Sequence, residues 1–128
     1  MKSKKIARKT VRAKPKVVDV CIDLKGAVTL SEDPVVVQVQ NQRIRWRLDP
    51  ASAKKWRIVG LCWCGDSPPP GEFHDWLREK ARLSVTDRNR TKGKWRYGIL
   101  YRDKNEKRSS PPRVFDPTIR NEPPSIQQ

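Results

Sequence analysis

Hydrophobic and polar residues alternate along much of the chain from Val17 to Asn121, with the period of two that is typical of half-buried β-strands. In 43–48 (RIRWRL), the three apolar side chains share one face and the three arginines share the other. The turn residues Asn41-Gln42 predict that this segment forms a hairpin with the strand before it. The segments that we expect to form strands are 17–24, 26–30, 35–40, 43–48, 56–64, 93–103 and 113–121.

Two segments depart from this simple alternation. Both faces of 56–64 are apolar, which predicts a central strand or a strand that lies under the loop that follows it. In 72–83, apolar residues recur every four positions, at Phe73, Leu77 and Ala81, and this spacing predicts a short amphipathic helix. Several short strands and one helix together predict an all-β protein, an antiparallel sandwich or a small barrel.

The first sixteen residues lack the alternation and are strongly basic. They hold eight Lys or Arg and no Asp or Glu, which is more than half of the net charge of +15 carried by the 128-residue chain. Because they offer too few apolar side chains to pack a core, we expect them to form a disordered tail. The expected organisation is therefore a basic tail over 1–16, a β-sandwich domain over 17–122 and a flexible C-terminus over 123–128.

The large positive charge predicts solubility and the kind of partner, and it does not predict the fold. Polyanions such as nucleic acid, the ribosome or an anionic membrane surface are the natural partners, although no segment approaches the ~20 apolar residues of a membrane span. The basic N-terminus is not followed by the apolar stretch of a secretory signal, and the cysteines number three, an odd count. These features predict a cytoplasmic protein with free thiols.

The cations that we expect to contact phosphates lie in the tail and on the polar faces of two strands. A basic run can bind phosphates through counterion release, but it can equally serve as a solubilising extension. The aromatic side chains fall mostly on the inward faces, opposite the strand arginines, which favours core packing over a base-stacking surface. The candidate residues are Lys4, Lys5, Arg8, Lys9, Arg12, Arg43, Arg45, Arg47 and Arg96.

The stretch 61–74 (LCWCGDSPPPGEFH) holds two of the three cysteines and the single histidine. In a strand, Cys62 and Cys64 would place their sulfurs on one face about 6–7 Å apart, too far for one Zn²⁺ or a direct disulfide. With Cys21 and His74 they make the one four-ligand set that the sequence offers. The spacing disfavours this set, so we expect no metal or cofactor and interpret Cys21 and Cys62 as small buried hydrophobic residues. A redox pair is a further alternative, although no evident helix N-terminus follows to lower a thiol pKa.

Four short motifs occur in an order that resembles the cupredoxin-like β-sandwiches of small bacterial proteins of unknown function. They are IRW at 44–46, WRIVG at 56–60, GKWRYGILY at 93–101 and FDPTIRNEP at 115–123. The resemblance covers roughly Val17 to Glu122 and implies an antiparallel Greek-key sandwich of the cupredoxin or immunoglobulin type. Cupredoxins bind copper through two His, one Cys and usually a Met, whereas this chain has one His and one Met. The resemblance therefore implies a copper-free sandwich.

The sequence shows no G-x-S-x-G elbow, no glycine-rich phosphate loop and no H-E-x-x-H motif, so we expect a protein that is not an enzyme. Two function classes remain open. The first is a binding module for nucleic acid or another polyanion. The second is an accessory protein that docks a protein partner, with charge only steering the encounter. A metal-binding or redox module is the third alternative, and the sequence leaves the oligomeric state open.

Overall fold

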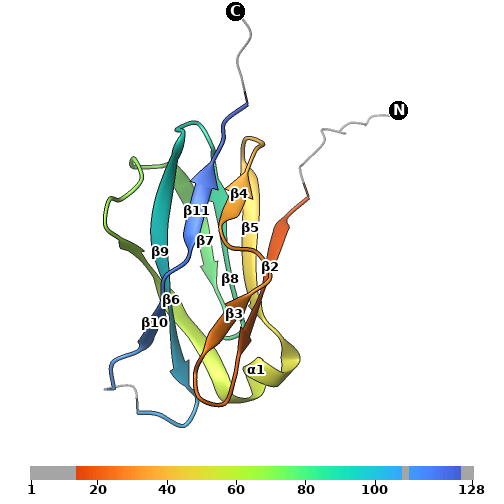
Figure 1. The fold of residues 1–128 in the computed structure, drawn as a ribbon, viewed down its shortest axis with the longest axis vertical. Coiled ribbons are helices and arrows are strands. Elements are labelled where there is room, and N and C mark those ends of the chain that lie inside the picture. The colour runs from red at the N-terminus through yellow and green to blue at the C-terminus, as the bar shows by residue number, and fades with distance from the viewer. Residues whose placement is uncertain (1–13, 108–109, 125–128) are drawn as a thin grey trace, which may run out of the picture.

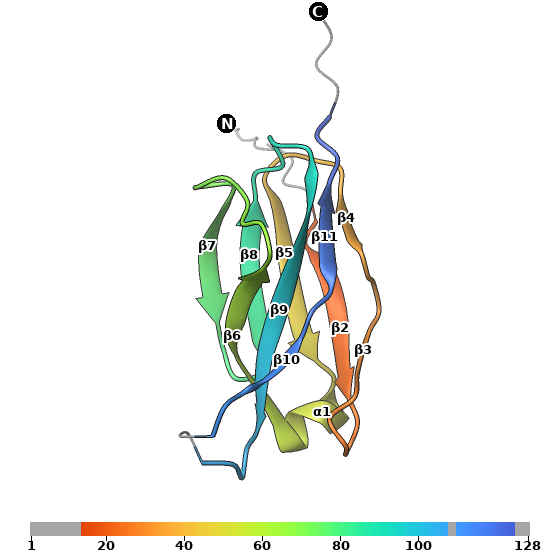
Figure 2. The same cartoon turned by 60° about the vertical axis from the view of Figure 1, so that its left-hand side comes forward.

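Strands dominate the structure, a computed structural model that describes residues 14–107 and 110–124 (Figure 1). They form two sheets that pack face to face, and in Figure 2 strands β9 and β6 of one sheet lie in front of β5 and β8 of the other. The first sheet has the strand order β3-β2-β5-β8-β7. Its strands are β2 (Lys16–Ile22), β3 (Val28–Leu30), β5 (Gln42–Leu48), β7 (Phe73–Arg78) and β8 (Arg82–Asp87).

The second sheet is organised around its longest strand, β9 (Gly93–Asp103), which pairs with three others. β6 (Trp56–Cys64) follows one edge of β9, and β10 (Arg113–Phe115) and β11 (Thr118–Asn121) share the other edge. β4 (Val35–Val37) lies beside β11. Over the described residues β6 is thus an edge strand, so the first of the two alternatives predicted from its apolar faces, a central strand, is wrong.

The core lies between the two sheets and is built by the inward faces that the alternating pattern predicted. Trp46 of β5 and Tyr97 of β9 meet there: the indole Nε1 donates to the phenol oxygen at 2.9 Å, and the ring centroids are 5.2 Å apart. Both side chains are fully buried, as are Ile44 and Ile119. Because β5 and β9 meet through these side chains, the arginines that alternate with them point to opposite outer faces of the sandwich.

Two strand pairs run parallel, so the sheets are mixed rather than antiparallel throughout. β2 pairs with β5, and β4 pairs with β11, in parallel register. The expected hairpin between 35–40 and 43–48 does not form, because β4 and β5 belong to different sheets. The all-β prediction is confirmed, whereas the prediction of purely antiparallel pairing is wrong.

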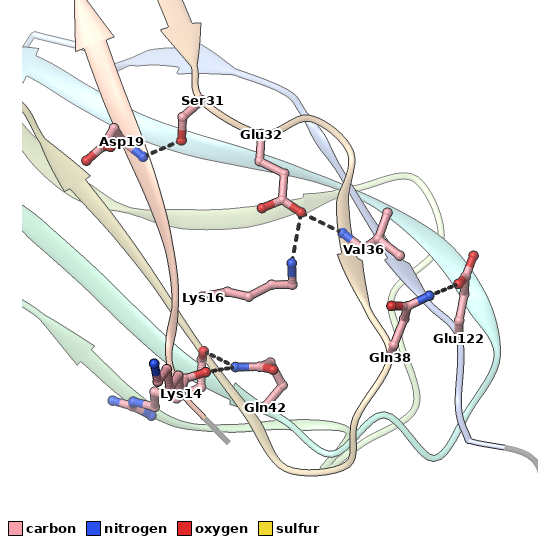
Figure 3. Close-up of polar contacts among 10 residues, drawn as sticks. Lys14, Lys16, Asp19, Ser31, Glu32, Val36, Gln38, Gln42 and Glu122 are labelled. Atoms are coloured by element: carbon pink, nitrogen blue, oxygen red, sulfur yellow. Dashed lines mark hydrogen bonds and ion pairs between the residues drawn. The ribbon is translucent and has the colours of Figure 1, made fainter. Parts of the chain in front are cut away.

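The chain crosses from the first sheet to the second between β3 and β4, and side chains fasten this crossing (Figure 3). Glu32 accepts from the Lys16 ammonium at 3.1 Å and from the backbone N–H of Val36 at 3.3 Å, which joins the start of β2 to β4. Beside it, the Gln42 amide donates to the carbonyl oxygen of Lys14 at 2.8 Å. Within the described residues, contacts with the sandwich are made from Lys14 onward, inside the segment that the sequence assigned to the tail.

The segment 72–83 is not a helix. It forms β7, a turn and the start of β8, and its apolar residues do not share a face, since Phe73 is buried whereas Leu77 is 53% exposed. Pairing with β8 overrides the helical spacing. The short helix is α1 (Pro50–Lys55), between β5 and β6, and the Asp49 side chain caps its first turn. Among the residues described, no helix is long and apolar enough to cross a membrane.

A buried polar network ties the loops together at one end of the sandwich. The Asn89 amide donates to three backbone carbonyls at 3.1–3.2 Å. Asp87, which is fully buried, accepts from the backbone N–H of Asn89 at 2.8 Å and from the Asn121 amide at 3.0 Å. Burial raises the pKa of Asp87 to about 6, and the negative charge of Glu72 acts in the same direction. The ionised form of Asp87 is therefore a source of instability at neutral pH.

Replacing Asp87 with asparagine should raise the free energy of unfolding by about 2 kcal/mol at about pH 7.5. The folded pKa of about 6 lies above the unfolded value of ~3.9, so the folded protein holds the proton more tightly, and wild-type stability falls as the pH rises through this window. Asparagine keeps the accepting Oδ1 and removes the charge, so its advantage should vanish near pH 4. Urea unfolding of both proteins at several pH values measures the difference, and an advantage that does not change with pH would contradict this explanation.

Candidate functional site

The strand arginines named from the sequence lie on two opposite faces. Arg43, Arg45 and Arg47 project from β5 on the outer side of the first sheet, whereas Arg96 projects from β9 on the outer side of the second. The inward neighbours of these residues form the shared core, which separates the two groups by the thickness of the sandwich. The structure therefore does not gather the four arginines on one surface.

Most of these arginines are already engaged by neighbours. Arg43 donates to a carbonyl oxygen of β7 and a hydroxyl of β8 at 2.6 and 3.0 Å. Arg47 pairs with Asp19 at 2.7 Å, and Arg96 pairs with Asp116 at 3.3 Å. These contacts reduce the charge that is available to a ligand. The tail candidates lie outside the described residues, namely Lys4, Lys5, Arg8, Lys9 and Arg12.

A separate hollow of about 340 Å³ is lined by cations and lies where the β7–β8 hairpin meets β6. Arg57 comes from β6, Arg78 from the end of β7, Lys80 from the turn that follows, and Arg102 from β9. The backbone N–H of Ile58 donates to the carbonyl oxygen of Lys80 at 2.8 Å, which holds this turn against β6. We call the space between these four side chains the four-cation hollow.

No carboxylate neutralises the four-cation hollow within the described residues. The acids next to these cations in sequence are engaged elsewhere: Glu79 pairs with Arg82 at 2.8 Å, and Asp103 pairs with Lys55 at 3.1 Å. None of the ion pairs formed by the described residues includes any of the four cations. The positive charge that faces the hollow is therefore uncompensated, which favours an anionic ligand.

Two of the four cations have buried donors without acceptors. Arg57 and Arg102 are direct neighbours across the β6–β9 pair, and like charges in this relation destabilise a sheet. Arg102 is only 8% exposed, and its Nη2 donates to the carbonyl oxygen of Ser110 at 2.6 Å. The Nε atoms of both arginines are buried and have no hydrogen-bond partner in the described part of the chain. A buried unpaired donor is costly, and both arginines line the hollow, where a bound anion would offset their uncompensated positive charge.

The hollow adjoins an apolar groove between β6 and β7, which we call the aromatic groove. Val59 and Arg78 line both, and the rest of the groove is lined by Gly60, Leu61, Trp63, Trp76 and Leu83. Trp76 is 44% exposed, and its ring centroid lies 6.2 Å from that of Trp63. Trp63 in turn lies 5.0 Å from the ring of Phe73, which is buried. The exposed indole of Trp76 therefore packs against Trp63, which in turn packs against the buried ring of Phe73.

An irregularity in β7 turns Trp76 toward β6. The register of β7 against β8 shifts between His74 and Leu77, and Asp75 between them has a positive φ of 58°. Asp adopts this conformation more readily than most residues, and bulges at sheet edges re-aim side chains. Sequence reasoning missed the groove because it placed Trp76 in a helix. The available signal was the closeness of aromatic and basic residues in 76–80 (WLREK).

The cysteines and the histidine do not form one site. Cys21 and His74 lie on the outer side of the first sheet, whereas Cys62 and Cys64 lie on the outer side of the second, with both sulfurs against Gly98. Cys21 is exposed and Cys62 is half-buried, so the interpretation of both as buried residues is wrong. Burial, followed by the charge and hydrogen bond of Cys62, raises the pKa of the Cys64 thiol, which disfavours the thiolate that a metal needs. Over residues 14–107 and 110–124, no group of three or more His, Cys, Asp or Glu could hold a metal ion.

Comparison with known proteins does not identify a function for this chain. The chain matches no protein-family model and no curated protein. Among solved structures it is similar to the crystal structure of a cysteine protease inhibitor from Entamoeba histolytica, with 12% sequence identity and a TM-score of 0.38. The match covers 85% of this chain and 98% of that chain.

Proposed function

We propose that this protein is a non-catalytic binding module for nucleic acid, which it holds through phosphates. The observation that carries the proposal is the four-cation hollow, where two arginines have buried Nε atoms without acceptors and no acidic side chain lines the space. Phosphate oxygens fit this requirement, because arginine binds them through charge-assisted and often bidentate hydrogen bonds. The hollow would fix the position of the ligand on the sandwich.

The charge of the whole chain supports the same proposal. The net charge is +15, and residues 1–16 alone contribute eight positive side chains. A protein of this kind displaces counterions from a phosphate backbone, so its affinity should fall steeply as salt rises. We assign the tail cations the role of contacts that add affinity without sequence preference. The strand arginines Arg43, Arg45, Arg47 and Arg96 should add little of the same kind, because three of the four are already engaged by neighbours.

Neutralising two cations of the hollow, in the variant Arg57→Gln/Arg78→Gln, should weaken binding of a mixed-sequence oligonucleotide about 10-fold or more at ~0.1 M salt. The slope of log affinity against log salt should also become shallower by about one for each phosphate that the variant no longer neutralises. Fluorescence anisotropy of a labelled oligonucleotide measures both quantities.

The matched control removes the same charge from residues that do not line the hollow. Arg47 and Arg82 face each other across β5 and β8 on the outer side of the first sheet, and each pairs with an acid. The variant Arg47→Gln/Arg82→Gln should change the affinity less than about threefold, since exposed paired charges contribute little. Equal losses in the two variants would mean that net charge alone drives binding, which would contradict a defined site in the hollow.

A protein-docking function is the second candidate, and the exposed apolar residues of β7 support it. Trp76 is 44% exposed and Leu77 is 53% exposed on a strand at the edge of its sheet. An edge strand can pair with an extended segment of a partner. Such a complex should depend on salt less than a phosphate complex does. A pull-down from lysate with and without nuclease separates the two candidates, because nuclease should remove partners that are held through nucleic acid only.

We further propose that the sandwich is a copper-free, Greek-key member of the cupredoxin-like class and that it acts in the cytoplasm. The order of the motifs between 44–46 and 115–123 supports the first part. The free thiols of Cys21, Cys62 and Cys64 support the second, because a reducing compartment keeps thiols free.

A further inference from the structure

The aromatic groove beside the four-cation hollow bears on the kind of nucleic acid that fits the site. We propose that the protein prefers single strands, with a phosphate in the four-cation hollow and a neighbouring base stacked on Trp76. The inference rests on the proposed function and specifies the form of the ligand at the same site.

The hollow and the groove are adjacent, as the phosphate and the base of a nucleotide are. Arg78 lines both the hollow and the groove, and it lies two residues from Trp76 on β7. A nucleotide joins an anionic phosphate to a flat aromatic base. The cations of the hollow can bind the phosphate, and the indole in the groove can stack on the base.

The exposed indole discriminates between single and double strands. In a duplex the bases stack on one another and present only their edges in the grooves, so their faces are closed to a side chain. In a single strand the bases can turn outward and stack on aromatic side chains, and every base has such a face. The phosphates of a duplex could contact the four cations, but its bases could not stack on Trp76. A duplex would therefore lose the contribution of the aromatic groove to binding.

The groove holds Trp76 in place before a ligand arrives. The register shift at Asp75 aims the side chain toward β6, and the ring meets Trp63 in an edge-on arrangement with an interplanar angle of 69°. Trp63 and Phe73 connect this pair to the core through ring contacts. A side chain held in this way loses little conformational freedom on binding, which is the condition under which stacking adds affinity.

An acidic polypeptide would satisfy the cations but would gain little from the indole. Carboxylate side chains carry no ring that could stack on Trp76, and sulfated polysaccharides carry saturated sugar rings rather than flat aromatic bases. Stacking therefore distinguishes a nucleic acid from other polyanions at this site, and this difference is the basis of the test.

The test compares Trp76→Ala with the conservative variant Trp76→Phe in the full chain. The probes are a labelled 12-nucleotide thymidine single strand, a 12-base-pair mixed-sequence duplex, heparin and polyglutamate. We expect the wild type to bind the single strand at least about fivefold more tightly than the duplex. Trp76→Ala should weaken single-strand binding about tenfold, within the range expected for the loss of one base stack, and leave heparin binding unchanged. Trp76→Phe should stay within about threefold of the wild type, because phenylalanine still stacks.

Each contrary result has a distinct meaning. Single-strand binding by Trp76→Ala that equals that of the wild type would overturn the inference, as would a preference for the duplex. A loss for polyglutamate that matches the loss for the single strand would also overturn it, in favour of an acidic polypeptide. If the wild type binds none of the four probes at low salt, the proposed function itself fails. Thermal unfolding confirms that the variants are folded, as expected for a side chain that is 44% exposed.

Discussion

Replacing Trp46 with alanine should lower the free energy of unfolding by about 3–5 kcal/mol, the largest effect on stability that we expect from one substitution. Trp46 is fully buried between the two sheets, so its removal leaves a cavity that the neighbouring strands can fill only in part. The substitution also takes away the donor that lies 2.9 Å from the hydroxyl of Tyr97, which is itself fully buried. Urea unfolding followed by far-UV circular dichroism measures the change.

Trp76→Ala provides the matched control for this measurement, because it removes the same side chain from a site that is 44% exposed. We expect that variant to cost about 1 kcal/mol or less. A cost for Trp46→Ala that is no greater than the cost for Trp76→Ala would show that the two sheets do not pack through Trp46.

Neutralising the tail should have the largest effect on affinity. A full-length variant in which the six cations within residues 1–13 become glutamine should bind a mixed-sequence oligonucleotide about 100-fold more weakly at ~0.1 M salt. The reason is counterion release, since each neutralised phosphate contributes about 0.7–0.9 to the slope of log affinity against log salt. Lys14 and Lys16 are left unchanged because the structure joins them to the sandwich, Lys14 through its backbone carbonyl and Lys16 as the first residue of β2, paired with Glu32. The six residues are Lys2, Lys4, Lys5, Arg8, Lys9 and Arg12.

The loss on neutralising the tail should be the same for every base composition. The six cations are expected to contact phosphates, and phosphate contacts carry no sequence information. Anisotropy titrations with A/T-rich and G/C-rich oligonucleotides measure this directly. An unchanged affinity and slope would contradict a role for the tail, and a loss confined to one composition would contradict the view that it adds affinity without sequence preference.

The inward faces of the strands could be predicted from the sequence because they depend on local alternation alone. A strand with one buried face repeats every two residues, so 43–48 and 93–103 show in the sequence which side chains form the core. Trp46, Tyr97 and Ile99 are buried as this pattern predicts.

The pairing of the strands could not be predicted in the same way. The backbone does turn at Asn41, which has a positive φ of 56°, but a turn does not show whether the next strand stays in the same sheet. The crossing to the second sheet is fastened by contacts such as that between Lys16 and Glu32, which are sixteen residues apart. Contacts of this range leave no periodic trace in the sequence.

The candidate site was the least predictable part for a related reason. Its cations come from β6, β7, the turn after β7 and β9, and they meet only because the sheets pack as they do. Trp76 reaches the groove through a register shift that the spacing of Phe73 and Leu77 conceals. The strand arginines were conspicuous in the sequence because they alternate with core residues. They lie on two opposite faces because β5 and β9 belong to different sheets, and each strand points its arginines outward.

Side-chain NMR of the isotope-labelled full chain tests most directly whether an anionic strand occupies the four-cation hollow. On addition of a thymidine pentanucleotide, we predict that the Nε–H resonances of Arg57 and Arg102 shift together with the indole N–H resonance of Trp76. The Nε–H resonances of Arg43 and Arg47, on the opposite face, should remain in place. Shifts confined to Arg43 and Arg47, or a bound oligonucleotide that leaves Arg57 and Arg102 unperturbed, would contradict the assignment of the site to the hollow.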